Sequence, residues 1–416
     1  MAGCATAPRT RSIAACVVTS KPKTDSSSIA WHLIDTTLLS CARAFSPVRA
    51  ARKLVGRPAG ACDLVNDAVP DSSFFTNRQI GRLSADEIRR GPTKPGQEAQ
   101  APFTITRLKG EGKTAGFFVT DAKGDHYLLK LDVAGYPELV TGAEVVVSKL
   151  LYALGYFVPS YEIISFTRKQ LSLDPKAERS PELVDKLLAA RIKNGRIRAS
   201  ASRMIDGDIV GHIAFKGYAC CAELRALRLA YAWLNNTDAK DHNSLLVWEH
   251  GRGVGYLIDF GTSLGGEAEH GPKKPCQGWE YDVDLGDWTR EILTLGLYSN
   301  GCKRDERPSS PALGRFSARF DPRRWKPYAP NLAFDDMTRA DARWMAARIM
   351  QLSQKQLKAA IAAGQYSDPE DERRLLEVLE ARRRAIAQAY APELLSHAKP
   401  AGSSAIDRQP PDWLVP

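Results

Sequence analysis

An acid and an amide lie five residues apart on one polar stretch, Asp238 to Asn243, and a second acid, Asp259, follows sixteen residues later. Phosphoryl transfer from a nucleotide needs such a set. One carboxylate orients the attacking hydroxyl, while an amide and a carboxylate hold magnesium on the phosphates. Asp259 opens an Asp-Phe-Gly triplet at the end of an expected strand. This spacing is typical of the second half of a kinase site.

The first half of such a site would lie upstream, where the sequence becomes β-rich at Phe103. An expected strand over 103–108 is followed by the glycine-rich segment Gly110–Gly116, a second strand over 117–120 and a third over 127–131. Two strands around a glycine-rich turn, followed by a third, predict an antiparallel meander. In a kinase-like site, this turn (Gly110, Gly112 and Gly116) would cover the nucleotide phosphates.

Other interpretations of the glycine-rich segment are weaker. A Walker A loop would place its first glycine at Arg107 and would need a helix afterwards. A dinucleotide fingerprint fits the letters, but a strand follows Gly116 where that motif needs a helix. An ordinary hairpin turn stays open.

Lys130 and Glu144 are the other two candidates in this half. Lys130 lies in the apolar strand Tyr-Leu-Leu-Lys-Leu, where an isolated lysine usually points to solvent. Glu144 follows fourteen residues later, on a helix expected over 141–154, and Thr141-x-x-Glu144 also fits a capping box. The functional alternative pairs Glu144 with Lys130, so that the lysine is held against the α- and β-phosphates. The order of all these features favours that alternative.

The polar stretch itself has competing interpretations. A calcium-binding EF-hand would need glycine at its sixth position and an acid at its twelfth, and neither occurs. A plain polar turn after the helix expected over 223–234 stays open. Asp259 follows Tyr-Leu-Ile and would be an acid among apolar neighbours, which is costly without a partner such as magnesium. No G-x-S-x-G motif supports a serine nucleophile.

Composition limits the class of protein. The chain has 416 residues, a net charge of +10 and 44% hydrophobic residues, typical of a soluble globular protein with a sizeable core. The charge would suit an anionic partner such as a nucleotide or phospholipid headgroups. Nucleic acid is an unlikely partner, because no basic run is interleaved with aromatic residues. No apolar run is long enough for a transmembrane segment.

The cysteines and the N-terminus bear on localisation. None of the eight cysteines has CxxC spacing, so zinc is not supported, and we expect Cys220 and Cys221 to pack as small hydrophobic residues. Met1 to Ala5 resembles the end of a bacterial lipoprotein signal, without the apolar stretch before Cys4. We therefore expect a cytoplasmic protein. If the true start lies upstream of Met1, an envelope lipoprotein acylated at Cys4 is the alternative.

The expected organisation has four parts. A partly disordered N-terminal extension, with a helix within 29–54, precedes a β-rich lobe with one helix and a charged insertion. A larger helical lobe follows, with helices near 338–352, 353–363 and 369–390, and then a flexible tail. The boundaries are 1–101, 102–204 with the insertion at 167–196, 205–398 and 399–416.

Residues 103–265 resemble the kinase-like superfamily in its atypical branches, nearest by motif to HipA-type and phosphatidylinositol 3/4-kinase-like kinases. The stretch from Gly142 to Glu144, with the exit Leu154-Gly-Tyr-Phe-Val-Pro159, is similar to the helix of HipA-type kinases that carries the ion-pairing glutamate. Asn236-Thr-Asp238 with Asn243 resembles their catalytic loop. Residues 68–78 and 279–297 look like a bacterial family that carries this core.

The resemblance implies an α+β, bilobal protein-kinase-like fold and ATP and Mg²⁺ as cofactors. It places the base role on Asp238, the metal roles on Asn243 and Asp259, and phosphate contact on Lys130. Lys240 stands where these branches commonly have histidine, and could offset charge on the transferring phosphoryl group.

The chain departs from eukaryotic protein kinases, because it lacks a His-Arg-Asp triplet and an Ala-Pro-Glu motif. The acceptor, whether a protein, a lipid or a small molecule, is therefore open. A pseudokinase-like nucleotide-binding or scaffolding protein is the rival hypothesis, and a lipid-anchored envelope protein is a third.

Overall fold

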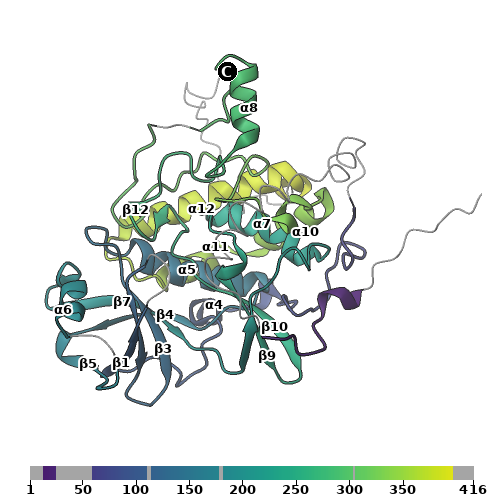
Figure 1. Cartoon of the computed structure of the whole chain (residues 1–416). Helices are drawn as coiled ribbons and strands as arrows, with labels where there is room; N and C mark the ends of the chain where they lie inside the picture. The colour runs from purple at the N-terminus through teal and green to yellow at the C-terminus, as the bar shows by residue number, and fades with distance from the viewer. Residues whose placement is uncertain (1–12, 25–58, 110–113, 178–180, 303–304, 397–416) are drawn as a thin grey trace, which may run out of the picture.

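The structure is a computed structural model that describes residues 13–24, 59–109, 114–177, 181–302 and 305–396. It is a mixed α+β structure, which confirms the α+β part of the expected fold class (Figure 1). The strands are β1 (Phe103–Leu108), β2 (Gly116–Thr120), β3 (His126–Lys130), β4 (Tyr161–Phe166), β5 (Leu171–Leu173), β6 (Ile192–Lys193), β7 (Arg196–Arg203), β8 (Asp208–Gly211), β9 (Ser244–Glu249), β10 (Arg252–Leu257), β11 (Gly266–Glu267) and β12 (Gly271–Pro272).

The helices fill the space between and after these strands. The α-helices are α4 (Ala85–Arg90), α5 (Leu139–Leu154), α6 (Pro181–Ala189), α7 (Ala222–Leu234), α8 (Leu285–Leu293), α9 (Leu332–Asp335), α10 (Arg339–Gln351), α11 (Gln354–Ala362), α12 (Pro369–Tyr390) and α13 (Glu393–Ser396). Four short 3₁₀ helices join them among the described residues: η1 (Ile13–Cys16), η3 (Ile80–Arg82), η4 (Arg168–Gln170) and η5 (Asp241–Asn243).

The largest sheet contains the predicted meander. Its order is β4-β7-β3-β2-β1-β5, and β1, β2 and β3 pair antiparallel as expected. The insertion at 167–196 extends this sheet, because β5 pairs parallel to β1 and β6 pairs with β7. Helix α6 of the insertion buries Val184 and Leu188 in the same apolar cluster as the sheet. The insertion is thus part of the sheet's own core.

Helix α5 begins two residues earlier than its predicted start and is not opened by a capping box. Its first backbone N–H groups bond to the Asp132 carboxylate, which accepts from Val140 and Thr141 at 3.0 and 2.9 Å. The Thr141 hydroxyl also donates to Asp132, at 2.8 Å. The capping-box interpretation of Glu144 is therefore wrong, because an acid distant from the helix supplies the acceptor and leaves Glu144 in the helix interior.

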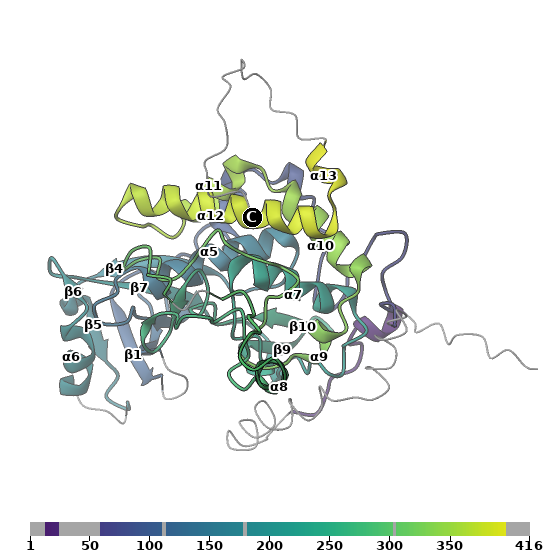
Figure 2. The same cartoon turned by 90° about the horizontal axis from the view of Figure 1, so that it is seen from above.

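A second, larger apolar cluster joins α5, α7, α10, α11 and α12. Figures 1 and 2 show α12 running over this group of helices. Helices α10, α11 and α12 match their predicted ranges closely, and the Asp368 side chain caps α12 by accepting from the Glu370 N–H at 2.9 Å. Among the described residues, every helix is too short or too polar to cross a bilayer.

The N-terminal extension packs on the body where it is described. Val18 accepts from the Gly253 N–H of β10 at 2.8 Å, so this part of the extension contacts the sheet of β8, β9 and β10. Phe74 and Phe75 are buried in the larger cluster. The predicted helix within 29–54, Cys4 and the tail at 399–416 lie outside the described residues.

The expectation for the paired cysteines is wrong. Cys221 forms a disulfide with Cys16, which is 205 residues away in the sequence. The Cys220 sulfur lies 2.6 Å from that of Cys62. The spacing could not show this, because the partners come from η1 and from the segment before Asp63. A second disulfide joins Cys276 to Cys302.

Candidate functional site

Lys130 is the last residue of β3 and is only 3% exposed. Its Nζ pairs with the Glu144 carboxylate of α5 and lies 3.0 Å from Oδ1 of Asp259. Burial lowers the pKa of Lys130, but the charges of Asp259 and Glu144 outweigh burial and raise it above its ordinary value. The solvent-facing interpretation of this lysine is therefore wrong, since a buried ammonium needs such partners.

Glu144 also ties the lysine to the Asp-Phe-Gly triplet. Its Oε1 accepts from the backbone N–H of Gly261 at 3.1 Å. A side chain at Gly261 would place its Cβ 2.8 Å from Val140, so glycine permits this close approach to α5. One carboxylate thus holds both the strand lysine and the backbone beyond β10.

Asp259 stands two residues after β10 with a φ of +61°, a left-handed conformation that is uncommon for a non-glycine residue. Its N–H lies 3.4 Å from the Tyr161 hydroxyl, and the neighbouring Phe260 is fully buried. Burial raises the pKa of Asp259, but the positive charges of Lys130 and then Lys109 outweigh it and lower the pKa to about 2. Backbone strain of this kind clusters at functional sites.

The predicted catalytic loop forms a second group beside the first. Helix α7 ends at Leu234, and the Asn243 side-chain amide donates to the Asp238 carbonyl at 2.8 Å. Lys240 pairs with the Asp238 carboxylate at 2.9 Å. The Asn243 carbonyl accepts from the Ile258 N–H at 3.0 Å, one residue before Asp259. This backbone bond joins the two groups.

The glycine-rich segment is only partly described. Gly110 and Gly112 lie outside the described residues. Gly116 is the first residue of β2 and pairs with Lys130 across the strands. A Cβ at position 116 would lie 2.3 Å from the Leu129 carbonyl oxygen. Packing alone therefore requires glycine here, whether or not a ligand binds.

Sequence reasoning missed two lysines of this region. Lys109, which directly follows β1, helps to lower the pKa of Asp259. Its own pKa is lowered by burial and by the nearby charge of Lys130. Lys109 immediately precedes the glycine-rich segment. That position is the sequence feature from which its place in the site could have been predicted.

The second missed lysine is Lys273, which follows β12 and is 1% exposed. Its Nζ donates to the Thr237 hydroxyl at 2.5 Å, directly beside Asp238. It also lies 3.4 Å from the Tyr328 hydroxyl. Burial lowers its pKa to about 7. No local pattern predicts this contact, because the two partners are 36 residues apart.

The arrangement suits a polyanion together with a hard cation. The positive charges of Lys130, Lys109 and Lys240 all lower the pKa of the Asp259 carboxyl group. Asp259 and Asn243 offer carboxylate and amide oxygens, which magnesium prefers. The low pKa keeps Asp259 ionised at neutral pH, so this donor set fits a divalent metal that also contacts phosphates.

Comparisons with known proteins add little at the level of sequence. No family model matches the chain, and no curated protein sequence matches it. The solved structure of the proinflammatory kinase CtkA of Helicobacter pylori is similar at a TM-score of 0.37 and 10% identity, over 72% of this chain and 98% of that kinase. A golgi casein kinase is similar at 0.38 and 10%, over 92% and 95%. Similarity at this level establishes neither a shared fold nor a shared activity.

Proposed function

We propose that this protein is an ATP- and Mg²⁺-dependent phosphotransferase with a kinase-like, bilobal core, which moves the γ-phosphoryl group to a hydroxyl acceptor. One observation carries the proposal: buried Lys130 is held between Glu144 and Asp259, which come from a helix and from the end of a hairpin far apart in the sequence. This pairing supports an ammonium kept charged and fixed for contact with phosphates.

The remaining roles follow from the chemistry of each side chain. Asn243 and Asp259 would hold magnesium, which when bound neutralises phosphate charge and orients the γ-phosphoryl group. Lys130 would contact the α- and β-phosphates, and the segment containing Gly110, Gly112 and Gly116 would cover them. The adenine would lie against the backbone of β7, next to β3 in the sheet.

The transfer step needs only positioning and charge. Asp238 orients the acceptor hydroxyl, whose oxygen forms the new bond to the γ-phosphorus as the bond to the β-phosphate oxygen breaks. The hydroxyl proton passes to Asp238, and ADP leaves with the electron pair of the broken bond. Lys240, paired with Asp238 at 2.9 Å, offsets charge on the moving phosphoryl group.

The test combines calorimetry with intact-mass analysis. Protein with Mg-ATP should bind nucleotide and transfer phosphate to itself or to a member of a screen of protein, lipid and small hydroxyl acceptors. Asp259→Asn should abolish transfer while leaving the chain folded. Asp206→Asn is the matched control, because that aspartate side chain is 92% exposed.

Two results would count against the proposal. Absence of nucleotide binding overturns the site itself. Nucleotide binding without transfer to any acceptor favours the pseudokinase-like alternative, and in that case Asp238→Asn should leave the binding affinity unchanged.

A further inference from the structure

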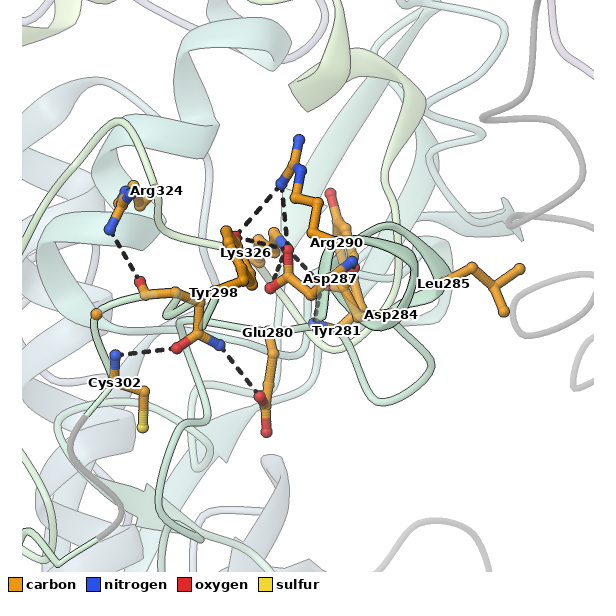
Figure 3. A network of polar contacts seen from close by, with 12 residues as sticks. Glu280, Tyr281, Asp284, Leu285, Asp287, Arg290, Tyr298, Cys302, Arg324 and Lys326 are labelled. Atoms are coloured by element: carbon orange, nitrogen blue, oxygen red, sulfur yellow. Dashed lines mark hydrogen bonds and ion pairs between the residues drawn. The ribbon is translucent and has the colours of Figure 1, made fainter. Parts of the chain in front are cut away.

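Helix α8 is attached to the body by its polar side. Lys326 pairs with Asp284 at 2.5 Å and with Asp287 at 3.0 Å, and Asp287 also accepts from the Tyr298 hydroxyl at 3.0 Å. Both aspartates are buried. An amphipathic helix of a globular protein normally turns its apolar side inward. Here the orientation is reversed (Figure 3), and the labelled Leu285 points away from the ion pairs.

The outward side of this segment is strongly apolar. Seven of the eleven exposed large hydrophobic side chains in the described part of the chain lie within residues 283–297, hereafter the α8 arm. They are Val283, Leu285, Trp288, Ile292, Leu293, Leu295 and Leu297, which are 51–93% exposed. Exposed apolar side chains gathered in one segment in this way mark an interaction site.

The arm projects from the molecule. In Figure 1, α8 rises away from the other helices, and in Figure 2 it is seen end-on. The disulfide between Cys276 and Cys302 closes the chain at the base of the arm. The surface is therefore a braced, convex ridge.

A basic hollow of ≈ 640 Å³ adjoins the arm. Its lining includes the cations Arg228, Arg290, Arg323, Arg324 and Lys326, against Asp287 and Asp335. Arg228 and Arg323 donate to backbone carbonyls, and neither forms an ion pair with a described carboxylate. The hollow thus carries positive charge available to an anionic group.

We propose that the α8 arm is a peripheral membrane anchor, which inserts its apolar side chains into an anionic phospholipid surface while the basic hollow receives a headgroup phosphate. Interfacial helices combine a strongly apolar side with an aromatic residue and low overall hydrophobicity, and α8 has these features with Trp288. The cations that such helices usually carry on their polar side are supplied here by the neighbouring hollow. Charge complementarity favours this occupant, because the hollow beside the arm is lined by five cations against Asp287 and Asp335, and Arg228 and Arg323 form no ion pair with a described carboxylate. The proposal does not depend on phosphotransfer.

Vesicle flotation of the full chain tests both components. The protein should float with vesicles of phosphatidylcholine and phosphatidylglycerol, and much less with phosphatidylcholine alone. Replacing Trp288, Ile292 and Leu293 together by serine should weaken binding about a hundredfold or more. Arg323→Gln with Arg324→Gln should weaken binding to the anionic vesicles by about fivefold per charge. Glu291→Gln removes an exposed negative charge from the arm and should strengthen binding to the anionic vesicles.

The control variant is Ile192→Ser with Ile209→Ser, because both isoleucines are 44% exposed but lie outside the arm. It should bind vesicles like the parent protein, and circular dichroism should show every variant folded. Absence of vesicle binding by the parent overturns the proposal, as does equal binding to neutral vesicles. Sedimentation showing a dimer that the triple serine variant disrupts, without vesicle binding, would assign the arm to a second copy.

Discussion

Lys130 and Lys273 are both almost fully buried, yet their surroundings differ in kind. Lys130 is paired with two carboxylates, and its pKa is raised despite burial. Lys273 donates to the Thr237 hydroxyl, forms no ion pair with a described carboxylate, and has its pKa lowered to about 7. The same side chain is therefore a permanent cation at one place and a group of variable charge at the other.

This difference separates two ways of building a polar site. Around Lys130, opposite charges offset each other's desolvation, so removing one partner leaves less compensation for the buried charges that remain. Around Lys273, a neutral hydroxyl satisfies the amine, and the charge state depends on pH. The hydrogen bond between Lys273 and Thr237, the residue before Asp238, therefore changes when the amine gains or loses a proton.

The largest expected effect comes from breaking the set around Lys130. Lys130→Met leaves Glu144 buried without its cation, and we expect a loss of about 3–5 kcal/mol in the free energy of unfolding. Urea denaturation measures this. The double variant Lys130→Met with Glu144→Leu should recover part of the loss, and a single variant as stable as the parent would show that the ion pair does not hold β3 to α5.

Removing the hydroxyl partner of Lys273 should have a smaller effect. Thr237→Val removes the acceptor from a buried donor, and we expect a loss of about 1–3 kcal/mol. Thermal denaturation against Thr237→Ser, which keeps the hydroxyl, isolates the hydrogen bond. Equal stability of the two variants would mean that Tyr328 alone satisfies the amine.

Lys273 should also contribute to the pH dependence of stability. Between pH 7 and pH 10.5 the unfolded chain holds this proton while the folded protein releases it, so stability rises with pH. The slope is about 1.4 kcal/mol per pH unit. Lys273→Met should lack this contribution, and denaturation of both proteins across the range compares their slopes. Parallel curves would contradict the lowered pKa.

The smallest effect is expected at the exposed edge of the site. The Lys240 side chain is 42% exposed, so Lys240→Ala should change stability by about 1 kcal/mol or less. If Lys240 has the proposed role, the same variant should lower phosphate transfer. A thermal shift together with a transfer assay would separate these contributions, and a large stability loss would place Lys240 in the core packing instead.

Local patterns predicted many of the elements. The β1–β3 meander follows from alternation around a glycine-rich turn, and α12 from Asp368 with Pro369 at the first helical turn. The ion pair of Lys130 with Glu144 was predicted from order along the chain and is present in the structure. Local signals also misled, since Thr141 and Glu144 satisfied a capping rule that Asp132 fulfils instead.

Contacts between distant segments could not be predicted in this way. Cys16 with Cys221, Lys273 with Thr237 and the outward side of α8 each depend on which element packs opposite. The amphipathic pattern of α8 fixes that one side is apolar, but not which way it points. That direction depends on Lys326, which pairs with the polar side from 39 residues beyond Asp287.

By itself the sequence determined the chemistry available: an acid and an amide on one loop, an acid in Asp-Phe-Gly, a strand lysine and a helix glutamate. Only the tertiary structure decided that Asp259 joins the pair of Lys130 and Glu144, that Lys109 lies close enough to act on Asp259, and that Lys273 reaches the loop. The physical reason is that residue types and spacing specify local hydrogen bonding and apolar periodicity. Desolvation and charge pairing depend on neighbours that the chain supplies from far away.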